Sequence, residues 1–310
     1  MKIVITGGAG FIGSHLAEYW LEREANVTII DNLRTGYLAN IPKHKNVEFI
    51  KDSITNKNLV FDVLEKADYV FNFAALVSVP ESVDNPGECN EINVLGLINL
   101  LEASKKYNIR KIVHSSSAAV YGDNPELPKK TSMKPEPKTP YGITKLDGEY
   151  YCQFYHQSFG VNSVSLRYFN VFGPRQDPKS QYAAALPIFI SKAIKNEDIT
   201  IYGDGNQTRD FIYVKDVVMA NVQAAENEKV FDVYNVANGS SISILDLARL
   251  IVKETDSKSE IIFKPERAGD IKHSLADIEL TRKDLDFSPK VALLDGIRKT
   301  IDFFGREFGK

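Results

Sequence analysis

Residues 2–32 read KIVITGGAGFIGSHLAEYWLEREANVTIIDN, and this stretch decides the fold. Lys2–Thr6 is rich in Ile and Val and predicts a short buried strand. Two glycines end this strand, a helical pattern follows from Gly13 to about Glu24, and Asn26–Ile30 predicts a second strand. A strand, a helix and a second strand in immediate succession indicate a βαβ unit with parallel strands.

The turn between the first strand and the helix carries a glycine motif, GGAGFIG, with Gly7, Gly10 and Gly13 at its key positions. Glycine permits a tight turn and lets the backbone approach a pyrophosphate, whose charge the N-terminus of the following helix favours. Asp31 ends the second strand, where an acidic side chain binds ribose hydroxyls. In this strand–turn–helix context the motif predicts a dinucleotide site. Asp31 would repel a 2′-phosphate and so favours NAD over NADP, although Arg34 nearby leaves NADP open.

The alternation of strands and helices continues through the first half of the chain. Patterns of buried strands occur at Val47–Lys51, Tyr69–Phe73, Lys111–Ser115 and Ser163–Arg167. Helical patterns occur at Asn58–Lys66, Asn93–Lys106 and Tyr141–Phe159. This alternation predicts an α/β fold, namely a Rossmann-type doubly wound parallel sheet, with residues 1–172 as the NAD-binding domain.

The pattern loosens after about Phe172, where Pro, Gly and Asp become frequent. Helical patterns return near Leu186–Lys195, Ser243–Glu254 and Leu293–Phe304. Ser243 followed by Asp246 is similar to a capping box with Asp in place of Glu. We expect residues 173–310 to form mainly a smaller α+β lobe that binds the substrate, with some chain returning to the sheet.

The composition excludes several classes of protein. A net charge of −3 over 310 residues gives no basic field for nucleic acid or an anionic membrane. The two cysteines, Cys89 and Cys152, have no histidine nearby at metal-ligand spacing, so we expect two buried or idle thiols, no disulfide framework and no metal. No secretory leader and no apolar run of about 20 residues is recognised, so we expect a cytoplasmic enzyme without a membrane span.

Tyr141 and Lys145 form a Tyr-x-x-x-Lys pair on one predicted helix, and this spacing places both side chains on one face. An ammonium beside a phenol favours the phenolate and lowers the pKa of the tyrosine toward the working range of a general base. The strand Lys111–Ser115 runs into the serines Ser115 to Ser117. Because the carboxyl ends of parallel strands are where α/β proteins bind ligands, these hydroxyls are expected beside the tyrosine.

Several motifs along the chain resemble one family of enzymes. They are GGAGFIG, then DNLRTG at residues 31–36, SSSAAVYG at 115–122, PYGITK at 140–145 and RYFNVFGPRQ at 167–176. With these motifs the chain resembles an extended short-chain dehydrogenase/reductase of the nucleotide-sugar epimerase branch, which includes the UDP-glucose and UDP-N-acetylglucosamine 4-epimerases. The resemblance covers essentially the whole chain.

The resemblance implies roles for individual residues. Ser117, Tyr141 and Lys145 become the catalytic residues, and Asn72 is a departure because many relatives have His there; we expect it to change packing more than chemistry. The implied NAD contacts are Gly7, Gly10, Phe11, Ile12, Gly13, Asp31, Asn32, Gly36, Asp52, Ser53, Ala74, Ala75, Asn93, Ser115, Tyr141 and Lys145. The implied substrate contacts are Ser117, Tyr141, Asn170, Arg209, Arg267, Asp270 and Ser274. Arginine suits the diphosphate because its planar fork pairs with phosphate oxygens.

Ala118 and Ala119 bear on the outcome of the reaction, because related dehydratases carry an acidic pair there that eliminates water. The absence of this acidic pair favours inversion at C4 of a UDP-hexose without net oxidation. Ser274 bears on the sugar, since a small residue at the matching place admits an N-acetyl group. A UDP-glucuronate 4-epimerase, a decarboxylase, a 4,6-dehydratase and a non-catalytic NAD-sensing protein stay open as alternatives.

The resemblance also implies a homodimer. In relatives the helices matching Asn93–Lys106 and Tyr141–Phe159 form a four-helix bundle between two subunits. The second helix here carries four aromatic side chains, Tyr150, Tyr151, Phe154 and Tyr155. The alternative is that these side chains simply pack against the sheet.

Overall fold

Parallel strands form the central sheet of the computed structural model, which describes residues 1–178, 185–266 and 272–307. Within those ranges the sheet has seven strands. In spatial order they are β11 (Val233–Val236), β6 (Ser163–Tyr168), β5 (Lys111–Ser117), β4 (Tyr69–Asn72), β1 (Lys2–Thr6), β2 (Asn26–Ile30) and β3 (Val47–Ile50). The predicted doubly wound parallel sheet is confirmed. The strand order reverses between β1 and β4, and the crevice at this switch point is where such sheets bind ligands.

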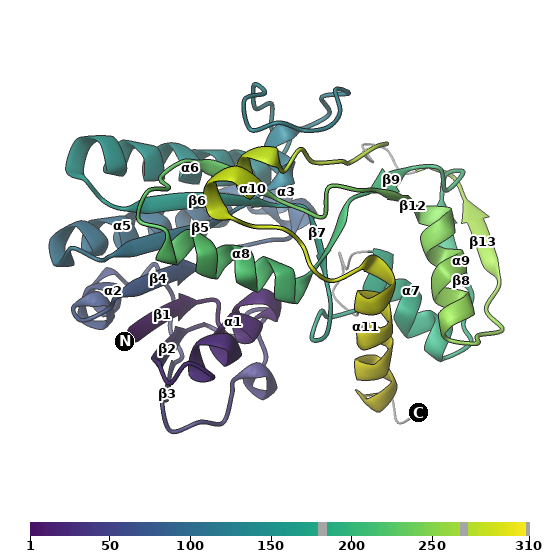
Figure 1. The fold of residues 1–310 in the computed structure, drawn as a ribbon, viewed down its shortest axis with the longest axis horizontal. Helices are drawn as coiled ribbons and strands as arrows, with labels where there is room; N and C mark the ends of the chain where they lie inside the picture. Colours follow the sequence, from purple (N-terminus) through teal and green to yellow (C-terminus); the bar gives the residue numbers. More distant parts are fainter. Residues whose placement is uncertain (179–184, 267–271, 308–310) are drawn as a thin grey trace.

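Side chains of the central strands alternate between two apolar layers. Val4, Val70 and Ile112 point to one layer, while Ile3, Phe71 and Val113 point to the other. The first layer is covered by α2 (Lys57–Leu64), α5 (Gly96–Tyr107) and α6 (Pro140–Phe159), and the second by α1 (Phe11–Leu21), α8 (Val214–Glu226) and α10 (Glu279–Leu285) (Figure 1). Each fully buried side chain of this size contributes about 1.5–3 kcal/mol, so both faces hold the sheet firmly.

A smaller lobe beside the sheet has its own apolar core (Figure 1). It contains α7 (Ala185–Ile194), α9 (Ile244–Glu254), α11 (Leu293–Glu307) and the parallel pair β8 (Ile199–Tyr202) and β13 (Ile261–Lys264). The predicted cap of α9 is confirmed, because the Ser243 hydroxyl accepts the Asp246 amide at 3.0 Å and donates to its carboxylate at 2.7 Å. In the described ranges no helix combines the length and apolar content needed to cross a bilayer.

Short elements lie in the loops of the sheet domain and between the sheet and the lobe. They are the parallel pair β7 (Asn170–Phe172) and β10 (Phe211–Tyr213), the antiparallel pair β9 (Thr208–Arg209) and β12 (Ile242–Ser243), the helices α3 (Val79–Asp84) and α4 (Pro86–Asn90), and the helical turns Leu38–Asn40, Glu91–Leu95 and Ala118–Tyr121. The short strands were not predicted from the sequence, since strands of two or three residues carry no periodicity, and α3 and α4 were not predicted either. Glu91–Leu95, by contrast, overlaps the helix predicted at Asn93–Lys106. The short strand pairs bring β7 and β9 to the carboxyl end of the sheet.

Candidate active site

The glycine turn after β1 is built for a close approach of backbone to backbone. Gly7 has a φ of +69°, and a Cβ on Gly7 would lie 2.7 Å from the amide nitrogen of Ala74. A Cβ on Gly13 would lie 2.5 Å from the carbonyl oxygen of Gly7. Gly10 is the N-cap of α1 and no side chain caps this helix. The N-terminus of α1 is therefore open to an anion, and a bound pyrophosphate fits it.

A cavity of about 840 Å³ opens at this turn, a size typical of sites for large ligands. Most of the predicted cofactor contacts line it. These are Gly7, Gly10, Phe11, Ile12, Gly13, Asp31, Asn32, Asp52, Ser53, Ala74, Ala75, Ser115 and Tyr141. We call this space the cofactor cavity, because its glycine cradle, open helix N-terminus and acidic end of β2 fit NAD.

Asp31 is fixed at the end of β2 by its own backbone surroundings. Its carboxylate accepts the amide of Ala9 at 3.0 Å and the amide of Leu33 at 2.8 Å, and burial raises its pKa. Arg34 donates to Glu81 at 2.6 Å and also pairs with Glu88. Two carboxylates therefore already neutralise the Arg34 guanidinium. Arg34 is the residue that left NADP open in the sequence, and in the structure it is not available to pair with a 2′-phosphate.

Three predicted cofactor residues are absent from the lining of the cofactor cavity, namely Gly36, Asn93 and Lys145. A Cβ on Gly36 would lie 3.0 Å from Ala9 and from the Asp31 carboxylate. The absence of a side chain at Gly36 therefore leaves space for the Asp31 carboxylate. Asn93 is buried, accepts the amide of Leu76 at 2.7 Å and donates to the Thr144 hydroxyl at 2.9 Å. Asn93 thereby ties the loop after β4 to α6.

Asn72, the departure from the family pattern, is also buried beneath the site. Its side-chain oxygen accepts the Thr6 hydroxyl at 2.7 Å, and its amide nitrogen lies 3.3 Å from the His114 ring. It lines neither cavity of the site.

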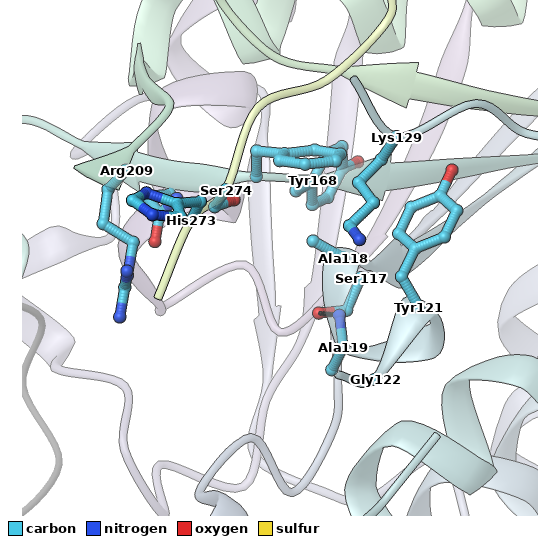
Figure 2. A pocket seen from close by; sticks show the side chains of 12 residues that line it. Ser117, Ala118, Ala119, Tyr121, Gly122, Lys129, Tyr168, Arg209, His273 and Ser274 are labelled. Carbon is cyan, nitrogen blue, oxygen red and sulfur yellow. Dashed lines mark hydrogen bonds between the residues drawn. The ribbon is translucent and has the colours of Figure 1, made fainter. Parts of the chain in front are cut away.

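A second cavity of about 280 Å³ adjoins the first, and we call it the sugar cavity (Figure 2). It brings together six residues singled out from the sequence, namely Ser117, Ala118, Ala119, Asn170, Arg209 and Ser274. Tyr168, at the end of β6, lines both cavities. Arg267 and Asp270 lie outside the described residues.

Tyr141 stands at the start of α6, where neighbouring groups hold its backbone. The Thr139 hydroxyl caps the helix by accepting the amide of Gly142 at 3.2 Å, and the buried Ser82 hydroxyl accepts the amide of Tyr141 at 3.1 Å. Burial raises the pKa of the Tyr141 phenol, and a hydrogen bond with the Ser117 side chain offsets this only in part.

Lys145 does not lower the pKa of Tyr141 in the way the sequence predicted. Its ammonium donates to the Ser115 carbonyl at 2.6 Å and lies 3.3 Å from the Ser115 hydroxyl, while its nitrogen is 5.8 Å from the centre of the Tyr141 ring. Burial lowers the pKa of Lys145 to about 8. The expectation of a depressed pKa for the tyrosine is therefore wrong, because burial of the phenol raises that pKa.

Several residues in the two linings were not singled out from the sequence. They include Tyr37, Arg175, Gln176 and Asp177 in the cofactor cavity, Lys129 and His273 in the sugar cavity, and Tyr168 in both. Tyr168, Arg175 and Gln176 belong to the RYFNVFGPRQ motif at the carboxyl end of β6, which could have indicated them. No local pattern marks Lys129 or Asp177.

Comparison with known proteins agrees with this geometry. The model of the NAD dependent epimerase/dehydratase family matches residues 3–237. A solved structure, the UDP-N-acetylglucosamine 4-epimerase from Methanobrevibacter ruminantium M1 in complex with UDP-N-acetylmuramic acid, is 43% identical with a TM-score of 0.95, covering 99% of this chain and 98% of that chain. The UDP-glucose 4-epimerase of Mycolicibacterium smegmatis is 36% identical over 309 residues, 98% of each chain. The UDP-N-acetyl-alpha-D-glucosaminuronate decarboxylase of Bacillus cytotoxicus is 33% identical over 321 residues, covering 98% of this chain and 97% of the relative.

The chain therefore belongs to the NAD dependent epimerase/dehydratase family. It is an NAD-dependent enzyme of the branch whose members are nucleotide-sugar epimerases and decarboxylases.

Proposed function

We propose that the chain is a UDP-hexose 4-epimerase that interconverts UDP-glucose and UDP-galactose, and accepts their N-acetylated counterparts, through a 4-keto intermediate. One observation carries the proposal. Tyr141 lines the cofactor cavity, its hydrogen-bond partner Ser117 lines the sugar cavity, and Tyr168 lines both. A proton-transfer pair thus lies at the junction of the two spaces, where a sugar carbon and a cofactor would meet.

NAD, when bound, accepts a hydride from the sugar and returns it. Tyr141 exchanges the proton of the C4 hydroxyl, and Ser117, hydrogen-bonded to it, orients that hydroxyl. The Lys145 ammonium contributes positive charge near the phenol, which favours its ionised form against the effect of burial. The backbone bonds from Ser82 and Thr139 hold the base in place during the cycle.

Ala118 and Ala119 support epimerisation over elimination. Both line the sugar cavity directly after Ser117, and their methyl groups can neither donate nor accept a proton. Elimination of water would need an acid and a base near the ring carbons. Small side chains also leave room for the sugar ring to turn over between the two hydride transfers.

The far side of the sugar cavity supports a nucleoside diphosphate handle. Arg209 lines it there, with Ser274 between Arg209 and the catalytic end (Figure 2). Asn170 also lines the cavity and donates to the carbonyl of Asp210, the neighbour of Arg209, at 3.0 Å. We propose that Arg209 pairs with the diphosphate, together with Arg267 and Asp270, and that the small Ser274 side chain admits an N-acetyl group.

Exposed apolar side chains on α6 support a homodimer. Tyr150 is 55% exposed and Phe154 is 50% exposed, and Leu95, on the helical turn that contacts α6, is 51% exposed. A set of this kind marks an interaction surface. Tyr155, by contrast, is buried and packs inward, so it takes no part in this surface.

The test is NMR product analysis of the NAD-loaded protein with UDP-glucose, UDP-galactose and their N-acetylated forms. Tyr141→Phe should reduce turnover by about 10²–10⁴-fold while NAD stays bound, as expected when a general base is removed. Tyr19→Phe is the control, because the Tyr19 hydroxyl is buried with no hydrogen-bond partner among the described residues and lies in neither cavity lining. Loss of CO₂ or water from the product, or full activity of Tyr141→Phe, would contradict the proposal.

A further inference from the structure

The sugar cavity has a cationic side chain at each end. Figure 2 shows Arg209 on one side, next to His273 and Ser274, and Lys129 on the opposite side, between Tyr168 and Tyr121. The Lys129 ammonium is directed toward Ala118 and Ser117. The described residues that line this cavity include no aspartate or glutamate, so Lys129 meets no acidic side chain among them.

Lys129 is held firmly in this position by its backbone. Its amide donates to the Leu275 carbonyl at 2.7 Å, and its carbonyl accepts the Asp277 amide at 2.9 Å and the Asn235 side chain at 2.8 Å. The residue is only 4% exposed. The side chain therefore enters the cavity from a fixed backbone and cannot swing freely into solvent.

The ammonium of Lys129 is incompletely satisfied. It has three N–H donors, and within the described residues its one hydrogen-bond partner is the neutral main-chain carbonyl of Asn124. No carboxylate in those residues lies within ion-pair distance of it, and Glu126 acts on it only from farther away. Burial lowers its pKa, as expected for a desolvated cation. A buried charge of this kind is stable only with an anionic or strongly polar partner.

We propose that Lys129 binds a carboxylate carried by the sugar, so that the preferred substrates are UDP-hexoses with an acidic substituent. This proposal rests on the proposed function. Arg209 and Asn170 lie at the diphosphate end, whereas Lys129 lies beside Ser117, so its partner belongs to the sugar and not to the diphosphate. A carboxylate at C6 of a hexuronate and one carried by an ether-linked lactyl group present the same chemistry to the ammonium.

The test compares acidic and neutral sugars on the full-length, NAD-loaded protein. The acidic probes are UDP-glucuronate and UDP-N-acetylmuramate, which separate the two carboxylate positions, and the neutral probes are UDP-glucose and UDP-N-acetylglucosamine. NMR gives kcat/KM for each, and calorimetry on Tyr141→Phe gives each Kd without turnover. We expect at least one acidic probe to exceed its neutral counterpart by about tenfold or more in both quantities.

Lys129→Met keeps an unbranched side chain that is only one atom shorter and removes its charge. This variant should reduce the affinity for the acidic probe by about 10–100-fold and change the affinities for the neutral probes by no more than about threefold. Lys129→Arg should restore part of the lost affinity for the acidic probe. An equal loss for acidic and neutral probes would overturn the proposal and make Lys129 a support for the Asn124 loop. Equal affinities of the parent protein for both classes would overturn it without any variant. If the protein epimerises no sugar, the proposed function fails, whereas the calorimetric comparison still decides the role of Lys129.

Discussion

Two walls of the cofactor cavity are joined by one hydrogen bond. The Tyr37 hydroxyl, from the loop after β2, donates to the Asp177 carboxylate at 2.6 Å, and both residues line the cavity. The segment that carries Asp177 is anchored at its other end to α1. There the His15 ring bonds the Pro174 carbonyl at 2.9 Å, and Arg175 donates to the Ser14 hydroxyl at 3.2 Å. The segment from residue 174 to 177 thus connects α1 to Tyr37 across the cavity.

Tyr37→Phe removes this bond and keeps the ring. A hydrogen bond to a charged acceptor contributes about 1.5–3 kcal/mol when sheltered, but Tyr37 is 51% exposed, so we expect about 1 kcal/mol. If the bond closes over bound NAD, dissociation of NAD should accelerate by about fivefold. The bond to Asp177, with burial, raises the pKa of Tyr37, so this contact is complete below pH 10 and weakens only as the pH rises through the higher folded value. The effect should therefore be constant between pH 7 and 9.

The assay is exchange of bound NAD for labelled NAD, followed by rapid filtration. Tyr19→Phe is the matched control, since it removes a tyrosine hydroxyl outside both cavities. If Tyr37→Phe releases NAD at the parental rate, the segment from 174 to 177 takes no part in retaining the cofactor, and the reasoning from its two anchored ends is wrong.

Three further predictions concern selectivity and stability. NADP should bind at least about tenfold more weakly than NAD, because the Asp31 carboxylate repels a phosphate and Arg34 is engaged by two glutamates; equal affinities in calorimetry would contradict this. Ser274→Tyr should lower turnover of N-acetylated sugars relative to plain ones, measured by NMR, and an unchanged ratio would remove Ser274 as the determinant. Burial raises the pKa of Glu18, but bonds from His15 and Arg175 outweigh it and hold that pKa at about 2, so its stabilisation is present above pH 4.5 and is lost as the pH falls toward 2. Thermal midpoints of the parent protein and Glu18→Gln should differ at neutral pH and converge near pH 2.

The strands of the first half could be predicted from the sequence to within one or two residues, whereas the short helices α3 and α4 could not. These strands are buried on both faces and read as continuous runs of Ile and Val, and glycines or an acidic residue mark their ends. The second half could not be predicted in this way. β11 has four residues and joins the edge of the sheet next to β6, and α8 follows so closely on β10 that its start has no signal. Such elements are defined by long-range pairing, which a local pattern does not contain.

The residues of the site also divide into those that a local motif predicts and those that long-range contacts place. Residues in motifs, such as Gly7, Asp31 and Ser117, could be placed because the motif carries its own strand or helix. Tyr37 and Asp177 are 140 residues apart, and their contact depends on how the chain after β7 returns across α1. Lys129 enters the sugar cavity because a bridge to Ala276 fixes its strand-like segment, and nothing within its own stretch of sequence indicates this.

The pair Tyr141 and Lys145 shows what a four-residue spacing predicts about an active site and what it does not. Residues four apart lie next to each other on one face of an α-helix, so the spacing places the ammonium near the phenol. The observed 5.8 Å from ammonium to ring centre agrees with this. Burial of the phenol nevertheless raises its pKa, and the Ser115 carbonyl holds the lysine where it is. The spacing therefore indicates a candidate base but not its protonation state, because desolvation depends on what packs around the helix.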